Sequence, residues 1–360
     1  MDLLTNPIKD YAWGSRTAIA ALTGRTAAGP EAEMWLGAHP SGPSRLARAG
    51  VQTTLDAVIA ADPAGELGAG LVERFGERLP YLMKLIAVDQ PLSMQVHPSV
   101  EQAAEGFIRG DRNYSDPWPK PEMICALTPF AALAGFRPPG ESAALLTALD
   151  LPALAPVIDR LAAGDVLGAL RTLVTWPADA RAALVQDVVR ACELDLVAEL
   201  AALYPSDPAV LAPLLMRRHD LAPGQALYLG AGVLHCYLKG FGVEIMGSSD
   251  NVLRAGLTPK PIDVEELLRI TDPATQPAEI IPVNDVYLTP APEFQLRRFT
   301  PGDGYRLPGA IPRILICVEG TVTIADDLKL HPADALYASA TEGPLDLTGQ
   351  GTVFCAEPRA

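Results

Sequence analysis

Two histidines, a glutamate and a glutamine stand in short segments of this chain, and all four are residue types that can bind a metal ion. Gln95 and His97 lie in Ser-Met-Gln-Val-His-Pro, Glu122 in Lys-Pro-Glu-Met, and His235 in Gly-Ala-Gly-Val-Leu-His. Two neutral imidazoles and one carboxylate suit a catalytic zinc ion, which keeps one position open for water or substrate. On a strand, residues two apart point to the same face, so Gln95 and His97 can reach one ion. By ligand chemistry alone, other divalent metals also fit.

Each of these residues taken singly is a weak indication of a metal, because a buried polar side chain usually just finds a hydrogen-bond partner. The chain has five histidines, and two of them fall in these segments. The sequence around them is more informative than the residues themselves.

Several long motifs surround the four residues. They are Gln-Pro-Leu-Ser-Met-Gln-Val-His-Pro (90–98), Lys-Pro-Glu-Met (120–123), the block Pro-Gly-Gln-Ala-Leu-Tyr-Leu-Gly-Ala-Gly-Val-Leu-His-Cys-Tyr-Leu-Lys-Gly (223–240) and Asp-Asn-Val-Leu-Arg-Ala-Gly-Leu-Thr-Pro-Lys (250–260). Together they resemble the type I phosphomannose isomerase family, strongly over 1–137 and 220–270 and elsewhere by order and length. Several independent motifs in one order are far more specific than a single short pattern.

The resemblance implies an aldose–ketose isomerase that interconverts mannose 6-phosphate and fructose 6-phosphate through an enediol. It also implies one zinc ion per chain, with Gln95, His97, Glu122 and His235 as the ligands. Such an ion polarises the substrate carbonyl and stabilises the developing enediolate.

The same resemblance marks residues for catalysis and substrate binding. The catalytic set is Lys120, Arg254, Lys84, Asp250 and Glu244, and the substrate-binding set is Ser93, Lys260 and again Arg254. Lys120 lies two residues before Glu122, on the same face of a strand. A buried lysine beside a dication can act as a base, but which of the two lysines does so stays open. Without the surrounding motifs, a solvated surface amine is the default for each.

One position departs from the family pattern. Many members have a histidine directly before Lys-Pro-Glu, with a suggested role in opening the sugar ring, and this chain has Pro119 there. Because proline cannot transfer a proton, ring opening here relies on other groups, such as Asp250 or metal-bound water, or on spontaneous opening.

Composition and charge narrow the class of protein. The 360 residues are 49% hydrophobic and 20% charged, which is typical of a globular chain of two or three domains. A net charge of −15 argues against nonspecific nucleic-acid binding, while a local cluster of cations can still hold a small anionic substrate. Five scattered cysteines without a Cys-x-x-Cys pair indicate free thiols, and no signal peptide or membrane span is expected. We therefore expect a cytoplasmic protein with a small sugar phosphate as its partner; the oligomeric state is not encoded, and a monomer is weakly favoured.

Short apolar runs separated by Gly and Pro predict a mainly β protein, and Ala and Leu at helical spacing predict an α-helical insert. The resemblance implies two cupin-like jelly rolls and a small helical domain. The expected domains are a discontinuous catalytic cupin-like domain (1–137 and 217–270), a helical insert (141–216) and a C-terminal cupin-like domain without metal (280–360).

Local patterns predict individual elements. Strands are expected over 81–88 and 123–128, a helix capped by Ser99 with Gln102 in a capping box, and an amphipathic helix over 263–270. The Pro-rich stretch 273–292 is predicted to be a linker.

Other functions also fit parts of the pattern. A catalytically silent cupin that binds a sugar phosphate is one, and loss of a ligand or a cleft cation would favour it. An isomerase acting on other aldoses is a second. A cupin metal oxygenase is a third, which the glutamine and the cleft cations disfavour.

Overall fold

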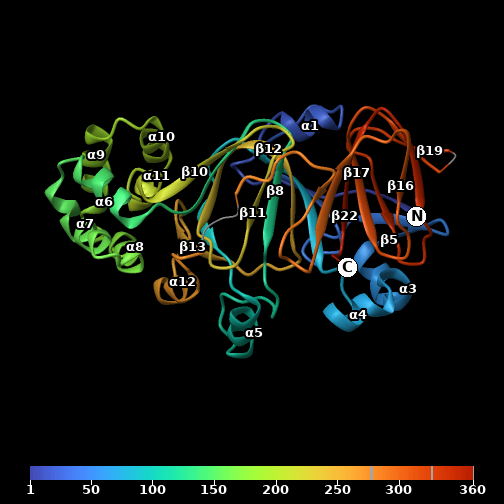
Figure 1. The fold of residues 1–360 in the computed structure, drawn as a ribbon, viewed down its shortest axis with the longest axis horizontal. Helices are drawn as coiled ribbons and strands as arrows, with labels where there is room; N and C mark the ends of the chain where they lie inside the picture. The colour runs from blue at the N-terminus through green and yellow to red at the C-terminus, as the bar shows by residue number, and fades with distance from the viewer. Residues whose placement is uncertain (276–278, 326, 360) are drawn as a thin grey trace.

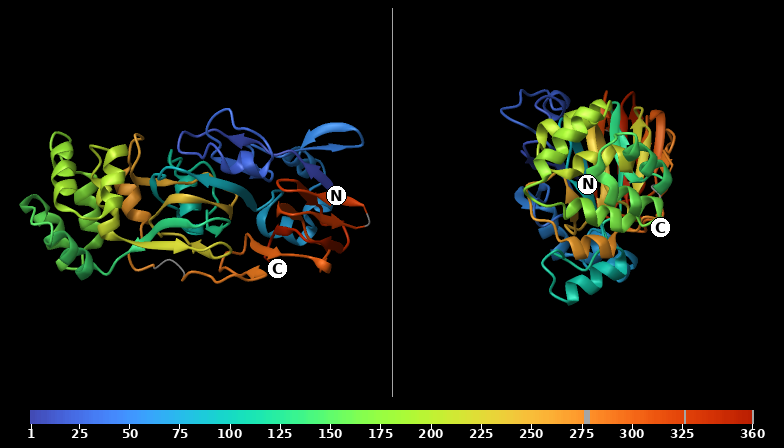
Figure 2. Two further views of the ribbon diagram at one scale, coloured as in Figure 1. Left: turned by 90° about the horizontal axis from the view of Figure 1, so that it is seen from above. Right: turned by 90° about the vertical axis from the view of Figure 1, so that its left-hand side faces the viewer.

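A computed structural model describes residues 1–275, 279–325 and 327–359 of the chain. The molecule is elongated, with a group of helices at one end, β-sheets in the middle and the C-terminal sheets at the other end (Figures 1 and 2). This arrangement confirms the prediction of a mainly β fold with an α-helical insert. None of the helices in the described ranges has both the length and the apolar character needed to span a bilayer.

The central sheet is organised around one long strand, β12 (His235–Gly247). Its first residues pair with β7 and β9, and its second half lies between β6 and β8. One strand therefore connects the two groups of neighbouring strands. The other strands of this sheet are β2 (Ile8–Lys9), β3 (Glu33–Leu36), β6 (Tyr81–Val88), β7 (Met94–Val96), β8 (Glu122–Ala126), β9 (Phe130–Phe136), β10 (Met216–Leu221), β11 (Ala226–Leu229) and β13 (Leu253–Gly256).

The C-terminal part of the chain forms a six-stranded and a four-stranded sheet. The six-stranded sheet holds β1 (Asp2–Leu4), β14 (Val286–Tyr287), β15 (Gln295–Phe299), β17 (Arg313–Glu319), β20 (Ala335–Ala338) and β22 (Thr352–Glu357). The four-stranded sheet holds β16 (Gly302–Leu307), β18 (Val322–Ile324), β19 (Leu328–Leu330) and β21 (Leu345–Gly349), and β4 (Arg45–Arg48) pairs separately with β5 (Val51–Thr54). The N-terminal strand β1 thus pairs with β20, far along the chain.

One hydrophobic core joins the two β regions. It contains Tyr81 and Leu85 from β6 together with Ile314 and Phe354 from the C-terminal sheet. The hydroxyl of Tyr81 also donates a hydrogen bond of 2.9 Å to the carbonyl of Ala356. The central and C-terminal sheets therefore bury apolar surface against each other, which is the main driving force for holding them together.

The helical group at one end consists of short amphipathic helices. Leucines at helical spacing, such as Leu161, Leu170 and Leu173, form its buried face, and Asp165 caps α8 by accepting a bond from the amide of Gly168. The helices of this group are α6 (Pro139–Thr147), η1 (Pro152–Leu154), α7 (Ala155–Ala162), α8 (Val166–Val174), α9 (Arg181–Ala191), α10 (Asp195–Leu203), η2 (Pro208–Leu211) and α11 (Ala212–Leu215). The others are α1 (Ala18–Leu22), α2 (Leu55–Ala61), α3 (Pro63–Leu67), α4 (Ala69–Phe75), α5 (Val100–Ile108) and α12 (Val264–Ile270).

Most of the predicted local elements are confirmed. The strand over 81–88 matches β6, the strand over 123–128 overlaps β8, and the helix over 263–270 matches α12. The capping box between Ser99 and Gln102 is present at the start of α5.

The prediction of a linker over 273–292 is wrong from Ile281 onward. Ile281 exchanges two backbone hydrogen bonds with Ala226, and β14 pairs with β15. Isolated bridges and two-residue strands are too short to show alternation, so they could not be recognised within a Pro-rich stretch. Residues 276–278 lie outside the described residues.

Candidate metal centre and substrate cavity

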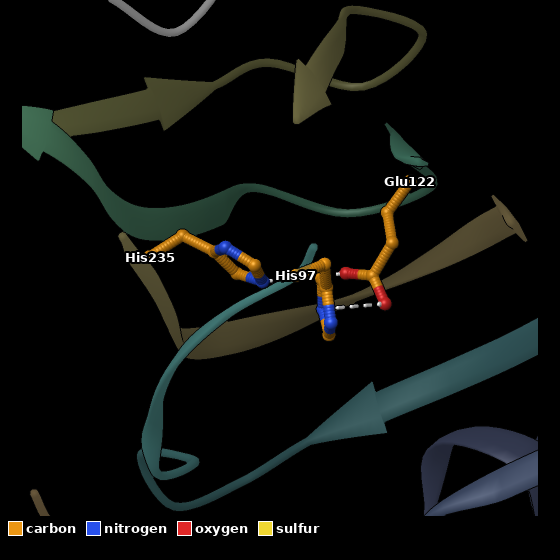
Figure 3. A group of neighbouring side chains, drawn as sticks. All are labelled: His97, Glu122 and His235. Atoms are coloured by element: carbon orange, nitrogen blue, oxygen red, sulfur yellow. Dashed lines mark ion pairs between the residues drawn. The ribbon is translucent and has the colours of Figure 1, made fainter. Parts of the chain in front are cut away.

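Three of the predicted metal ligands meet at one point inside the central sheet. His97 follows β7, Glu122 begins β8 and His235 begins β12, and their side chains point toward one another (Figure 3). The Glu122 carboxylate lies 3.2 Å from Nε2 of His97 and 3.3 Å from Nε2 of His235. One ligand atom from each residue lies within 4.8 Å of the others. The three donors are therefore close enough together to hold one ion.

Hydrogen bonds fix the tautomer of both imidazoles. Nδ1 of His97 lies 2.8 Å from the carbonyl of Asn251, and Nδ1 of His235 lies 2.9 Å from the carbonyl of Val233. Because a carbonyl only accepts, each Nδ1 carries the proton and donates it. Each Nε2 is then left with a free lone pair that faces Glu122. A backbone carbonyl in this position is a usual orienting partner for a metal-binding histidine.

The facing atoms have no hydrogen-bond partner among the described residues. Nε2 of His97, Nε2 of His235 and Oε2 of Glu122 are all buried and unpaired. Buried polar atoms are almost always satisfied, so three buried acceptors that converge need a positive charge between them. The donor set and its geometry thus fit a metal ion with nitrogen and oxygen ligands.

The charges around the three residues favour the forms that bind a metal. Burial and the nearby positive charge of Lys120 lower the pKa of His97 to about 4. Burial opposes ionisation of Glu122, but Lys120 and the two imidazoles hold the pKa of this carboxyl well below its ordinary value. At neutral pH the site therefore presents a neutral His97 and an ionised Glu122, as metal binding requires.

The remaining predicted residues surround the same site. A cavity of about 400 Å³ is lined by nine of the eleven predicted residues, and the other two, His97 and His235, contact Glu122. The nine are Ser93, Gln95, Lys84, Lys120, Glu122, Glu244, Asp250, Arg254 and Lys260. The structure therefore brings the whole predicted set to one place.

Gln95 lies at the centre of the strand register. On β7 it is paired with His235 of β12 on one side and with Arg254 of β13 on the other. It lines the cavity beside Glu122. Its position is consistent with the predicted fourth ligand, and its coordination of a metal stays a prediction.

The two lysines have different surroundings. Lys84 is buried, with its ammonium 3.2 Å from Glu244 and 3.6 Å from Glu33. Burial would lower the pKa of Lys84, but the carboxylates of Glu33, Glu244 and Glu122 raise it overall. Lys120 instead lies 2.8 Å from Glu122 and lines the cavity. Lys84 is therefore held in its charged form within a carboxylate pair, whereas Lys120 stands beside the metal-binding carboxylate.

The cations expected to meet a phosphate lie on β13 and the loop after it. Burial lowers the pKa of Arg254, and no carboxylate in the described part of the chain counters this effect. Lys260 is exposed at the cavity edge. Arg254, which forms no ion pair with the described residues, and the exposed Lys260 are thus two cations available to an anion.

The region around Pro119 holds a histidine–aspartate contact. Pro119 is buried and is absent from the cavity lining, so it offers no proton donor. Asp250 lies at the cavity edge, 3.5 Å from Nε2 of the buried His39. Nδ1 of His39 accepts a bond from the amide of Ser41, which places the proton of His39 on the nitrogen facing Asp250.

Several cavity residues were not predicted as site residues from the sequence. Glu33 pairs with Lys84, and Trp35 and Tyr237 line the cavity. The available signal was alternation, because Glu33 and Trp35 share a strand face, as do His235 and Tyr237. Tyr204 comes from the helical group and carries no such signal, since it reaches the cavity only through the tertiary fold.

Comparison with known proteins agrees with this geometry. The family model for the catalytic domain of type I phosphomannose isomerase matches residues 1–139. Mannose-6-phosphate isomerase from Escherichia coli (strain K12) is 35% identical over 98% of this chain and 98% of its own length. The protein of the same description from Homo sapiens is 30% identical over 94% of this chain and 93% of its own.

Solved structures match over the full length. A crystal structure of a mutant phosphomannose isomerase from Salmonella typhimurium has a TM-score of 0.92 at 30% identity and covers 100% of both chains. A zinc-bound mannose 6-phosphate isomerase has a TM-score of 0.90 at 30% identity, covering 100% of this chain and 99% of its own. On motifs, fold and overall similarity, this chain belongs to the type I phosphomannose isomerase family.

Proposed function

We propose that this chain is a zinc-dependent mannose-6-phosphate isomerase, which interconverts mannose 6-phosphate and fructose 6-phosphate. The observation that carries the proposal is the convergence of three unpaired buried acceptors from His97, Glu122 and His235 beside a cavity rich in cations. The relatives of the same name and the zinc-bound structure support the same reaction and metal.

The first task of the site is to hold the substrate. Arg254 and Lys260 offer a planar fork and a point charge, which together suit a phosphate, and Ser93 adds a hydroxyl. A phosphate held at this edge directs the sugar carbons toward Glu122 and Lys120. Fixing the reacting carbons in this way removes much of the entropic cost of the reaction.

The second task is to move a proton between two adjacent carbons. Zinc bound by His97, Glu122, His235 and Gln95 would polarise the carbonyl oxygen and stabilise the enediolate. We assign the proton transfer to Lys120, because it lines the cavity beside Glu122. Lys84, in contrast, is paired with two carboxylates. Lys84 and Glu244 form a buried charged pair that keeps the floor of the cavity rigid and polar. We assign Asp250, oriented by His39, to ring opening in place of the residue that Pro119 replaces.

The proposal is tested by following fructose 6-phosphate formation from mannose 6-phosphate with a coupled assay. Wild-type protein is expected to turn over, and Glu122→Gln is expected to lose both bound zinc and activity, because a neutral amide cannot replace the ionised carboxylate. Glu105→Gln, on the outer face of α5, serves as a matched control. A zinc-loaded wild type without turnover on either sugar phosphate would instead favour a sugar-phosphate-binding cupin or an isomerase of other aldoses.

We further propose that three units build the enzyme. They are a catalytic cupin-like unit (1–137 and 217–270), a helical insert (141–216) and a C-terminal cupin-like unit without metal (280–360). A core made only of C-terminal residues supports the third unit, whereas the core of the insert also takes in residues of the central sheet.

We also propose that the protein is cytoplasmic, which the five free cysteines support. We further propose that it is a monomer, and light scattering of the purified protein measures its mass in solution.

A further inference from the structure

One carboxylate of the helical insert binds the loop that borders the substrate cavity. Asp207 lies between α10 and η2, and it accepts a hydrogen bond of 2.9 Å from the amide of Ala209 within its own turn. Its other oxygen accepts a bond of 2.7 Å from the amide of Leu257, fifty residues later in the chain. Leu257 directly follows β13, the strand that carries Arg254. Asp207 thus ties the insert to the loop that leads to Lys260.

At the start of this loop, the backbone of Leu257 adopts a conformation that is unfavourable without the hydrogen bond from its amide to Asp207. Leu257 has a φ of +52°, a left-handed conformation that residues with a side chain rarely adopt. Gly256 before it has a φ of +151°, and a Cβ there would lie only 2.2 Å from the Cβ of Ala209. The chain can therefore take this path only with glycine at 256 and with a partner that stabilises Leu257. Asp207 is that partner.

The loop held in this way borders the substrate cavity. Thr258, Pro259 and Lys260 line it together with Tyr204 of the insert, and all four also line an adjoining cavity of about 770 Å³ under the helices. Within the loop, the amide of Lys260 donates to the Thr258 hydroxyl at 3.1 Å. A second cavity behind the loop means that its position is not fixed by close packing on that side. The start of the loop is held by the bond from the Leu257 amide to Asp207 and by the burial of the Leu257 side chain.

We infer that Asp207 is a positioning residue for substrate binding, through which the helical insert holds Lys260 and Arg254 in place for the phosphate. The inference rests on the proposed function, since it takes the anion to be the phosphate of a sugar phosphate. It gives the insert a role in substrate binding at the active site.

Kinetics of two substitutions test this role. Asp207→Ala removes both acceptors, whereas Asp207→Asn keeps one oxygen and the shape of the side chain. Asp207→Ala is expected to raise the KM for mannose 6-phosphate about tenfold or more, the effect of one lost charged hydrogen bond. Asp207→Asn is expected to raise it less, and in both variants kcat and zinc content change little, because the metal site is untouched.

A matched control separates positioning from general damage to the insert. Asp165→Ala removes an equivalent cap in the same helical group, at the start of α8, but Asp165 lines neither cavity. It is expected to leave the KM unchanged. An equal rise in KM for Asp165→Ala, or an unchanged KM in folded Asp207 variants, overturns the inference.

Binding of inorganic phosphate keeps the test independent of catalysis. Calorimetric titration of zinc-loaded wild type and Asp207→Ala with inorganic phosphate is expected to show weaker binding in the variant by a similar factor. If wild type lacks isomerase activity, the proposed function fails while this comparison still decides the role of Asp207. Equal phosphate affinities in both proteins reject that role whatever the activity.

Discussion

Two lysines stand near the metal-binding side chains, and their partners give them different roles. Lys84 is enclosed by Glu33 and Glu244, so its charge balances two buried carboxylates. Among the described residues, the carboxylate that pairs with Lys120 is that of Glu122, which belongs to the metal site. We therefore expect loss of Lys84 to disturb the folded state and loss of Lys120 to disturb the reaction.

Lys120→Ala is expected to keep zinc and lose turnover. Removing a general acid–base group typically lowers the rate by roughly 10²–10⁴-fold. Zinc content and kcat measured on one preparation provide the check, with Lys239→Ala on the exposed side of β12 as the control. Turnover near the wild-type rate with full metal content would remove Lys120 from the proton transfer.

Lys84→Ala is expected to destabilise the protein. The substitution leaves Glu33 and Glu244 buried without their counter-charge, a loss of about 3–5 kcal/mol when one partner of a buried pair is removed. Denaturant unfolding of the metal-free proteins measures it. A free energy of unfolding within about 1 kcal/mol of wild type would show that water or proton uptake compensates the two carboxylates.

At the residue scale, the sequence motifs predicted which residues gather at the site but not all of their partners. Ligand types and long motifs pointed to Gln95, His97, Glu122 and His235. Tyr204 and Asp207 were not predicted, because Tyr204 lines the cavity and Asp207 bonds to the loop beside it only when the insert folds against distant parts of the chain. Such contacts leave no periodic signal in the chain.

At the scale of elements, a bulge decides which side chains of β12 face the cavity. His235 and Glu244 are nine residues apart, so strict alternation would place them on opposite faces of the strand. The pairing of β12 with β9 shifts register between Tyr237 and Lys239, and this extra residue brings Glu244 to the same cavity as Tyr237. Alternation in the sequence predicts the strand, but a bulge depends on its partner and is not visible there.

Helix α12 is held beside the cavity loop by a charged cluster that responds to pH. Glu266 accepts hydrogen bonds from Arg269 and from the Tyr114 hydroxyl. Burial opposes its ionisation, but these bonds lower the pKa of Glu266 from 4.5 to about 2. Because the folded state binds this proton less readily, the stability that Glu266 adds is complete above about pH 4.5 and is lost as the pH falls toward 2.

Glu266→Gln is therefore expected to destabilise the protein at neutral pH and less so in acid. The measurement is the free energy of unfolding of wild type and variant at pH 7 and near pH 3, with both proteins stripped of metal so that zinc release does not contribute. Glu199→Gln on the exposed face of α10 is the control. A difference between wild type and Glu266→Gln that stays constant with pH would contradict the assignment.

At the scale of the whole molecule, the shared core predicts that the two β regions unfold together. Phe354 of β22 is fully buried in the core that also contains Tyr81 and Leu85 of β6. The four tryptophans all lie between residues 13 and 176, outside the C-terminal sheets. Tryptophan fluorescence therefore reports only on the rest of the molecule.

Phe354→Ala is expected to cost about 3–5 kcal/mol and to shift the unfolding transition seen by tryptophan fluorescence. The shift is expected because the C-terminal sheets share one core with the part of the molecule that contains the tryptophans. Loss of packing in the sheets therefore destabilises both. An unmoved fluorescence transition, with a separate loss of β structure by circular dichroism, would mean that the C-terminal unit unfolds alone.

The overall fold was predicted in outline from the pattern of apolar residues and from the family resemblance. Leucine-rich helical spacing located the insert, and short apolar runs located the β regions. The pairing of β1 with β20 was not predicted, because it joins the two ends of the chain and a three-residue strand carries no pattern of its own.

The central claim is that His97, Glu122 and His235 hold one zinc ion that the isomerisation requires. The most direct measurement is to titrate metal-stripped protein with zinc and to record bound zinc and turnover of mannose 6-phosphate on the same samples. We predict that activity rises in proportion to bound zinc and levels off at about one ion per chain, as a site with one set of converging ligands requires. Zinc that binds fully without restoring turnover, or turnover that persists in protein shown to be free of metal, would contradict the account.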